Sequence, residues 1–172
     1  MTAPRIGLAS ETIWAAHAQT RPDYRRDGAP GVVHLGLGAF HRAHQAMVFD
    51  RLLASGDGRW GVHGVGMTQP ALVDALRAQD GLYAVRVANA QGSHWAVPGA
   101  LWHLSVAATE REAVVQAIGA PSTRWVTVTV TEKGYTPALA QLLRDGLRLR
   151  WQHQLPGLTI ASCDNLQANG RK

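Results

Sequence analysis

Short runs of β-branched and apolar residues alternate with segments of helical pattern along most of this chain of 172 residues. The runs of strand character are residues 32–35, 60–67, 82–87, 95–106, 124–131 and 158–163. Helical patterns lie between most of these runs. Such alternation is typical of parallel strands joined by right-handed crossovers. The sequence therefore predicts an α/β fold with a doubly wound, mainly parallel sheet and helices on both faces.

Three helices carry recognisable signals. Thr109 and Glu112 have the spacing of a capping box, so we expect a helix that starts there and ends near residues 119–121. Thr136 followed by Pro137 is typical of an N-cap with proline at the first helical position, and predicts a helix to about residue 152. In the helix expected at 39–53, helical spacing predicts a core-facing row of Ala39, Ala43, Ala46, Phe49 and Leu53.

The first thirty residues differ from the rest of the chain. They are polar and are interrupted by Pro22 and Pro30, with a turn signal at Asp27 and Gly28. We expect an N-terminal arm over residues 1–30 and one folded domain over 31–172. A chain of this length can bury one core, but it is short for a two-domain enzyme.

Charge and composition narrow the class of partner. The net charge of +5 and the pI near 10.1 raise the question of nucleic acid, but the arginines are scattered and no nucleic-acid-binding module is recognisable. No apolar run reaches the roughly 18 to 20 residues that span a bilayer. We therefore expect neither a nucleic-acid nor a membrane partner. The single cysteine, Cys163, and the lack of a signal-peptide pattern favour a cytoplasmic location.

A glycine-rich segment joins the first predicted strand of the domain to the first helix. It reads Gly36-Leu37-Gly38-Ala39-Phe40-His41. Glycines at this point let backbone amides approach a pyrophosphate, whose charge the helix dipole favours. His41 replaces the third glycine of the usual dinucleotide fingerprint, so a tight turn without a ligand is the alternative.

The residues after the second predicted strand leave the type of dinucleotide open. A carboxylate there would normally hold the adenosine ribose, but Met67, Thr68 and Gln69 occupy the place. The sequence therefore does not decide between the two dinucleotides, and the expected cofactor is NAD with NADP not excluded.

A metal site is not expected. His41 and His44 are three residues apart on one predicted helix, which brings two imidazoles to the same face. A metal needs more ligands than these, and no Cys, Asp or Glu stands at suitable spacing. Polar packing or contact with a cofactor explains the two histidines better.

Polar residues follow two further strands. Residues 131–135 come after the run at 124–131, and Cys163, Asp164 and Asn165 follow the last strand. Ligands bind at the carboxyl edge of a doubly wound sheet, so these segments and the glycine turn predict one site. Ordinary turn and cap chemistry is the alternative, because Thr, Asp and Asn are common at such ends.

Three segments together resemble a known family. HLGLGAFHRAHQA at 34–46, VTVTEKGY at 128–135 and SCDNLQANG at 162–170 are similar to the N-terminal domain of the polyol-specific long-chain dehydrogenases, of the mannitol dehydrogenase and fructuronate reductase type. The resemblance implies a Rossmann-like, NAD(P)-binding domain over residues 31–172. It also implies an oxidoreductase that interconverts the secondary alcohol of a polyol or aldonate with the corresponding ketose or keto-acid, without a metal.

The resemblance also implies roles for individual residues. The cofactor contacts would be Gly36, Gly38 and Phe40 along the dinucleotide and Thr131, Glu132 and Lys133 at the nicotinamide end. Asn165 or Asn169 would face the carbonyl oxygen of the substrate, and the sequence does not choose between them.

The family's catalytic lysine lies in a C-terminal helical domain, for which this sequence, ending at Lys172, has no counterpart. We therefore expect a cofactor-binding half that is inactive by itself, and Lys133 is not the catalytic lysine. The alternative is a non-catalytic dinucleotide-binding remnant or binding module. Apolar residues at 139–147 and Trp151 would then be exposed, which predicts self-association through that surface. The expected small-molecule partner is a polyol or sugar acid.

Overall fold

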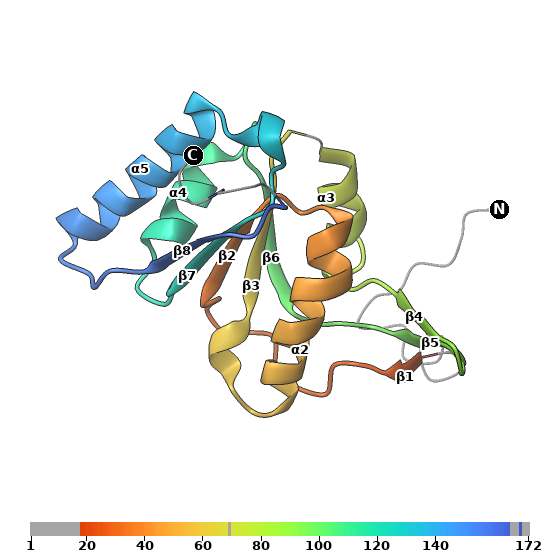
Figure 1. The fold of residues 1–172 in the computed structure, drawn as a ribbon. Coiled ribbons are helices and arrows are strands. Elements are labelled where there is room, and N and C mark those ends of the chain that lie inside the picture. The colour runs from red at the N-terminus through yellow and green to blue at the C-terminus, as the bar shows by residue number, and fades with distance from the viewer. Residues whose placement is uncertain (1–17, 69, 166–168, 170–172) are drawn as a thin grey trace.

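The computed structural model describes residues 18–68, 70–165 and 169, and its main element is a five-stranded parallel sheet (Figure 1). The strands are β2 (Val32–Leu35), β3 (Val62–Gly66), β6 (Leu101–Val106), β7 (Trp125–Val128) and β8 (Thr159–Ser162). Their order is β6-β3-β2-β7-β8. The first of these strands in sequence, β2, therefore lies at the centre, as in a Rossmann-like sheet. The predicted parallel sheet is confirmed.

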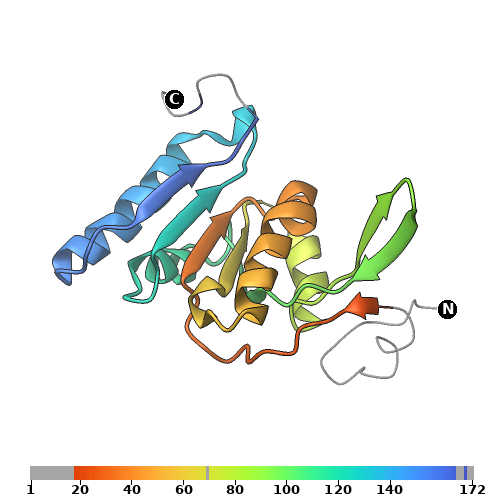
Figure 2. The same ribbon diagram turned by 60° about the horizontal axis from the view of Figure 1, so that its bottom comes forward.

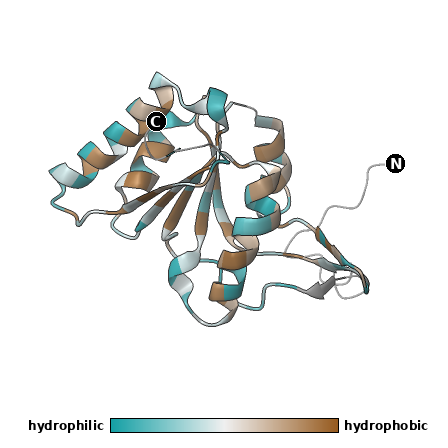
Figure 3. Ribbon diagram, in the orientation of Figure 1, coloured by the Kyte–Doolittle hydropathy of each residue, from teal (hydrophilic) through white to brown (hydrophobic). Residues whose placement is uncertain are grey.

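Helices cover both faces of this sheet, as predicted. They are α2 (Ala46–Ala54), α3 (Pro70–Arg77), α4 (Arg111–Gly119) and α5 (Pro137–Gln152). Val32 packs in one core with residues of α2 and α3, and the next residue, Val33, packs in a second core with residues of α4 and α5. Successive strand residues point to opposite faces, so a strand buried on both sides is apolar except where a polar side chain, such as His34 in β2, has hydrogen-bond partners. Figure 3 shows this apolar centre of the sheet.

The first helix begins differently from the prediction. Its first full turn is the π-helix η1 (His41–Gln45), which continues into α2. A π-turn holds one residue more than an α-turn, which shifts the face that the preceding residues present. Ala39 and Ala43 are therefore exposed, while Ala46, Phe49 and Leu53 are buried as predicted. The core-facing role expected of Ala39 and Ala43 was wrong, and His41 is buried in their place.

The capping box expected at the start of α4 was also wrong. Glu110 is the N-cap residue, and no side chain caps the helix. The carboxylate of Glu110 reaches back instead to the amide of Val106 (2.7 Å) and to Arg77, so the helix begins later than the Thr109 signal implied. The signal at α5 is confirmed, because the side chain of Thr136 accepts a hydrogen bond from the Leu139 amide.

A second, three-stranded sheet extends away from the main body (Figure 2). It consists of β1 (Ala18–Thr20), β4 (Val85–Asn89) and β5 (Gly92–Ala96), and β4 pairs with β5 as an antiparallel hairpin. The strand character expected over 95–106 is therefore divided between two sheets. The break falls at the buried residues Val97–Ala100, where the Gly99 amide donates to the Asp50 carboxylate (2.7 Å).

Part of the expected N-terminal arm lies against the domain. The hydroxyl of Tyr24 donates to Asp50, and Arg26 donates to the carbonyl oxygens of Gly99, Asp80 and Leu101. Residues 1–17 lie outside the described residues, so the arm over 1–30 stays a prediction.

The apolar residues of α5 divide between the core and the surface. Leu139 and Leu142 are buried, whereas Leu147 and Trp151 are exposed, Trp151 to 79%. The exposed apolar surface of α5 is therefore smaller than the sequence predicted, and self-association through it stays a prediction.

None of the helices in the described residues has both the length and the apolar character needed to cross a membrane.

Arg150, near the end of α5, is buried without a carboxylate partner among the described residues. Its guanidinium donates to the carbonyl oxygens of Ile118 (3.2 Å), Ala120 (2.7 Å) and Pro156 (2.8 Å). Two of these carbonyls lie at the carboxyl end of α4, where helical carbonyls have no partner within the helix and attract a cation. Arg150 therefore ties the end of α4 to α5 and to the turn before β8.

We predict that Arg150→Met lowers the free energy of unfolding by about 2 to 3 kcal/mol, because it leaves carbonyl groups without a donor. Arg148→Met, on the exposed side of the same helix, is the matched control and should change stability by less than about 0.5 kcal/mol. Urea denaturation followed by circular dichroism measures both. Equal midpoints for the two variants would show that Arg150 does not secure α4.

Candidate functional site

The glycine turn begins at a position that only glycine fits. Gly36 directly follows β2 and has a φ of +102°, and a Cβ there would lie 2.2 Å from the carbonyl oxygen of Thr129. The amides of Gly36 and Leu37 both donate to the Val65 carbonyl (3.0 and 3.2 Å). The turn is therefore packed between the ends of β7 and β3.

Gly38 is in a different environment. A Cβ built on Gly38 would have no neighbour closer than the Gly36 carbonyl oxygen, at 3.9 Å. The Arg42 amide donates back to the Gly38 carbonyl (3.2 Å), so the amides of residues 39–41 precede the first helical hydrogen bond. The first turn holds no acidic residue. Open space over a glycine beside the amino end of a helix is what a pyrophosphate needs.

Two buried histidines lie against the turn. The rings of His34 and His41 stack with their centroids 3.5 Å apart. Nε2 of His34 donates to the Gly36 carbonyl (2.9 Å), which can only accept, so Nδ1 accepts from the Thr127 hydroxyl (2.7 Å). Burial holds the pKa of His34 well below its usual value and lowers the pKa of His41 to about 4. Both rings are therefore neutral near pH 7. His44 is exposed and does not share this environment.

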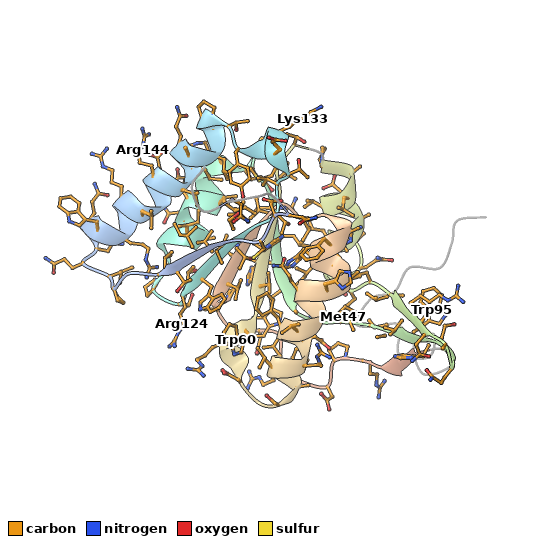
Figure 4. All side chains as sticks on the ribbon, viewed as in Figure 1. Met47, Trp60, Trp95, Arg124, Lys133 and Arg144 are labelled. Carbon is orange, nitrogen blue, oxygen red and sulfur yellow. The ribbon has the colours of Figure 1, made fainter. Side chains whose placement is uncertain are left out.

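The loop after β7 contains a strained residue. Thr131 has φ 64° and ψ 172°, a conformation that is essentially restricted to glycine and costs about 1–3 kcal/mol. It leads into the short helix η3 (Glu132–Gly134). Thr131, Glu132 and Lys133 are all exposed, and Lys133 lies at the upper edge of the molecule in Figure 4.

The residues after β8 hold this loop. The carboxylate of Asp164 accepts hydrogen bonds from the amides of Val130 (3.1 Å) and Thr131 (2.9 Å) and from the Tyr135 hydroxyl (2.8 Å). Asn169 donates from Nδ2 to the Asp164 carbonyl (2.8 Å), whereas Asn165 is exposed. Either asparagine remains a candidate for the substrate carbonyl.

A cleft of about 450 Å³ lies at the same carboxyl edge of the sheet. Its lining includes Met67 and Thr68 after β3, Ala107 and Ala108 after β6, and Thr131 and Lys133 after β7. In the described part of the chain no carboxylate lines it, so Glu132 of the same loop lies outside the lining. Lys133 and Arg111 add positive charge, although Arg111 is paired with Asp145. A partly apolar cleft with cationic groups fits a ligand that carries an aromatic ring and phosphates.

The structure thus brings together the three segments that the sequence assigned to one site. Thr129 donates to the Gly36 carbonyl (2.8 Å), and Asp164 binds the start of the 131–134 loop. Phe40 lies at the start of the first helix, 54% exposed. In the described residues, no three side chains of His, Cys, Asp or Glu come close enough to hold a metal.

Sequence reasoning missed the clamp formed by Asp164 and the polar network of His34, Thr127 and Thr129. The repeat VTVT at 126–129 did hold a signal, because residues 127 and 129 of a strand point to the same face. No local pattern indicated that Asp164 would bind amides 33 and 34 residues earlier.

Comparison with known proteins identifies the family. A sequence profile for the mannitol dehydrogenase Rossmann domain matches residues 30–172. The chain belongs to the mannitol dehydrogenase family. Mannitol 2-dehydrogenase of Emericella nidulans is 36% identical over 181 residues, which cover 87% of this chain and 36% of that enzyme. Mannitol 2-dehydrogenase of Cereibacter sphaeroides is 34% identical over 179 residues, covering 88% and 38%.

Two solved structures have the same fold. D-Sorbitol dehydrogenase in its substrate-free form matches with a TM-score of 0.80 and 28% identity. Mannitol 2-dehydrogenase of Pseudomonas fluorescens, solved as a ternary complex with NAD and D-mannitol, matches with a TM-score of 0.85 and 27% identity. Each match covers 98% of this chain and 40% of the other. The chain therefore spans about two fifths or less of the length of these relatives and solved structures.

The neutral histidine pair predicts a loss of stability in acid. The folded state protonates His41 only near pH 4, whereas an exposed histidine binds its proton near pH 6.5. The unfolded chain therefore holds more protons between these values, and stability falls as the pH falls through this window. The loss for His41 approaches about 3 kcal/mol, at about 1.4 kcal/mol per pKa unit.

We expect His41→Phe to reduce this acid-dependent loss, because it keeps a stacked ring and removes the proton-binding group. The exposed His44→Phe is the matched control and should keep the wild-type profile. Urea unfolding at intervals from pH 7 to pH 4 gives the three curves. Parallel curves for wild type and His41→Phe would show that burial of His41 does not couple stability to pH.

Proposed function

We propose that this chain binds NAD through the turn at Gly36–Gly38 and forms the cofactor-binding part of a polyol dehydrogenase. The observation that carries the proposal is the open position over Gly38 at the centre of the sheet. After β2 the chain first builds β3 and β6 on one side and then crosses to β7 on the other. Doubly wound sheets bind their ligands at this switch point, beyond the carboxyl ends of the strands.

The residues present fit a dinucleotide. The amides of residues 39–41 and the positive end of the helix dipole would hold the pyrophosphate, with Gly38 leaving room for it. Phe40 would lie along the cofactor, and Thr131, Glu132 and Lys133 would line its nicotinamide end. Met67 and Thr68 line the cleft where a ribose-binding carboxylate would often stand, so NADP is a second candidate.

The proposed reaction is oxidation of a secondary alcohol of a polyol or aldonate to the ketone, and its reverse. The cofactor, when bound, would supply the hydride acceptor for the carbon that bears the alcohol. Asn165 or Asn169 would donate a hydrogen bond to the oxygen as it changes from hydroxyl to carbonyl. The alcohol proton must pass to a base, and Lys133 is not assigned this role because it belongs to the loop on the cofactor cleft.

A dinucleotide-binding module without turnover is the second candidate. The observation that favours it is that the described polar groups lie on the glycine turn and the two adjacent loops, where they would contact the cofactor. Binding of NADH is common to both candidates, whereas turnover distinguishes them.

We predict that the chain binds NADH weakly and that Gly38→Val raises the dissociation constant at least tenfold, which corresponds to about 1.4 kcal/mol. The branched side chain would fill the space that the pyrophosphate needs, while the fold has room for it. Isothermal titration measures the affinity, and thermal unfolding checks that the variant is folded.

Gly58→Val is the control, because a Cβ on Gly58 meets no atom within 4 Å, so the fold has room for it as at Gly38, and the residue lies in the turn that precedes β3. Its affinity for NADH should match that of the wild type. Equal titration curves for wild type and Gly38→Val would count against a cofactor site at this turn.

The 172-residue chain by itself should not turn over polyols or aldonates at a measurable rate. No residue of the proposed site is assigned as the general base. A positioned general base contributes about 10²–10⁴ in rate, and correct orientation of the substrate contributes further. NADH absorbance followed with mannitol, arabinitol, mannonate, fructose and fructuronate is the test. Turnover that disappears in Lys133→Ala would establish Lys133 as the proton-transfer residue and this chain as an active enzyme.

A further inference from the structure

The strained backbone of Thr131 lies in the wall of the cleft, and cofactor contacts by themselves do not require it. A residue with a Cβ holds the glycine-type conformation with φ 64° and ψ 172°, and it does so in the wall of the cleft. Strained backbone persists only where its surroundings determine it. Glycine at this position would adopt the same conformation without strain.

The Asp164 carboxylate provides the constraint. Its two oxygens accept from two consecutive amides, Oδ2 from Val130 and Oδ1 from Thr131, so the peptide plane before Thr131 is fixed. The Tyr135 hydroxyl donates to Oδ2 as well. Asp164 is itself held in place, because its carbonyl accepts from Asn169 and the preceding Cys163 amide donates to Val128 (2.9 Å).

This clamp determines the shape of the cleft wall. After Thr131 the chain reverses into η3, and the turn is so tight that a Cβ on Gly134 would lie 2.5 Å from that of Val130. Val130, Thr131, Lys133 and Gly134 all line the cleft, whereas Asp164 does not. A group outside the cleft therefore sets the positions of four residues inside it.

We propose that Asp164 is a positioning residue for the cofactor cleft: by holding Thr131 in its glycine-type conformation, it places the 131–134 loop against the nicotinamide half of the dinucleotide. The inference rests on the proposed NAD binding. It predicts that Asp164 acts through Thr131, so a change at residue 131 that removes the strain should reduce the need for the carboxylate.

The test is a double-mutant cycle of Asp164→Asn and Thr131→Gly, with NADH and ADP-ribose as the two probes. ADP-ribose lacks the nicotinamide ring, so it reports the rest of the site. We expect Asp164→Asn to weaken NADH at least tenfold and ADP-ribose less than threefold. In the Thr131→Gly background, the same substitution should weaken NADH less than threefold, because glycine adopts the conformation without the clamp.

Asp57→Asn is the matched control. Asp57 also accepts hydrogen bonds from a backbone amide, that of Arg59, and from a side chain, the Trp60 indole, but it lies before β3 and away from the cleft. This variant should leave both affinities within twofold of wild type. Urea unfolding of each variant shows which are folded.

Distinct outcomes separate the two proposals. Wild-type protein that binds neither probe overturns the proposed cofactor site and this inference with it. Wild-type binding of NADH, with the same loss from Asp164→Asn in both backgrounds, overturns the inference alone. If Asp164→Asn does not fold, Thr131→Gly should unfold at higher urea than Thr131→Ala, since only glycine relieves the strain; equal midpoints would also overturn it.

Discussion

The close contact between the backbone of Gly36 and the carbonyl of Thr129 is the constraint on which the rest of the site depends. It brings the ends of β2 and β7 together with no space for a side chain. The Gly36 carbonyl then accepts from the Thr129 hydroxyl and from His34, so the turn is fixed by polar contacts as well as by packing. Because of this contact, the glycine turn and the 131–134 loop flank the same edge of the sheet.

The basic composition of the chain has a partly structural origin. Arg26 and Arg150 donate to backbone carbonyls in places where the chain changes direction, and Arg42 donates to the Leu37 carbonyl beside the glycine turn (2.8 Å). A guanidinium presents five donors in a fixed geometry and binds carbonyls of separate segments at once. Positive charges placed in this way do not need an anionic partner, which agrees with their scattered positions in the sequence.

The fold could be predicted largely from local patterns, with two exceptions that lie at the starts of helices. Buried strands such as β2 are mainly apolar, with His34 as the exception in β2, and Thr136 with Pro137 marks the start of α5. The capping box at Thr109 did not form: Glu110 is the N-cap residue, and its carboxylate binds the Val106 amide. The π-turn at His41–Gln45 is not a property of helical periodicity. Neither arrangement follows from the residue spacing alone.

Strand ends and glycines in the sequence predicted where the site lies, but not the contacts between its residues. Parallel topology alone placed Gly36, Thr131 and Asp164 at one edge, so their convergence could be expected from the sequence. The role of Asp164 could not, because it depends on the distance between its carboxylate and amides that belong to another strand end. The stacking of His34 on His41 likewise follows from the π-turn, which the sequence did not indicate.

Two features near the proposed cofactor site lower the stability of the fold. Thr131 retains a side chain in a conformation that suits glycine, and Nε2 of His41 is buried with no hydrogen-bond partner among the described residues. Glycine at position 131 would have no backbone strain, and an apolar ring at position 41 would bury no unpaired polar atom. Departures from local consistency are expected where a protein binds or reacts. Both departures flank the glycine turn, one on the helix that follows it and one on the neighbouring loop, so two of the locally unfavourable features of this domain lie where a dinucleotide would bind.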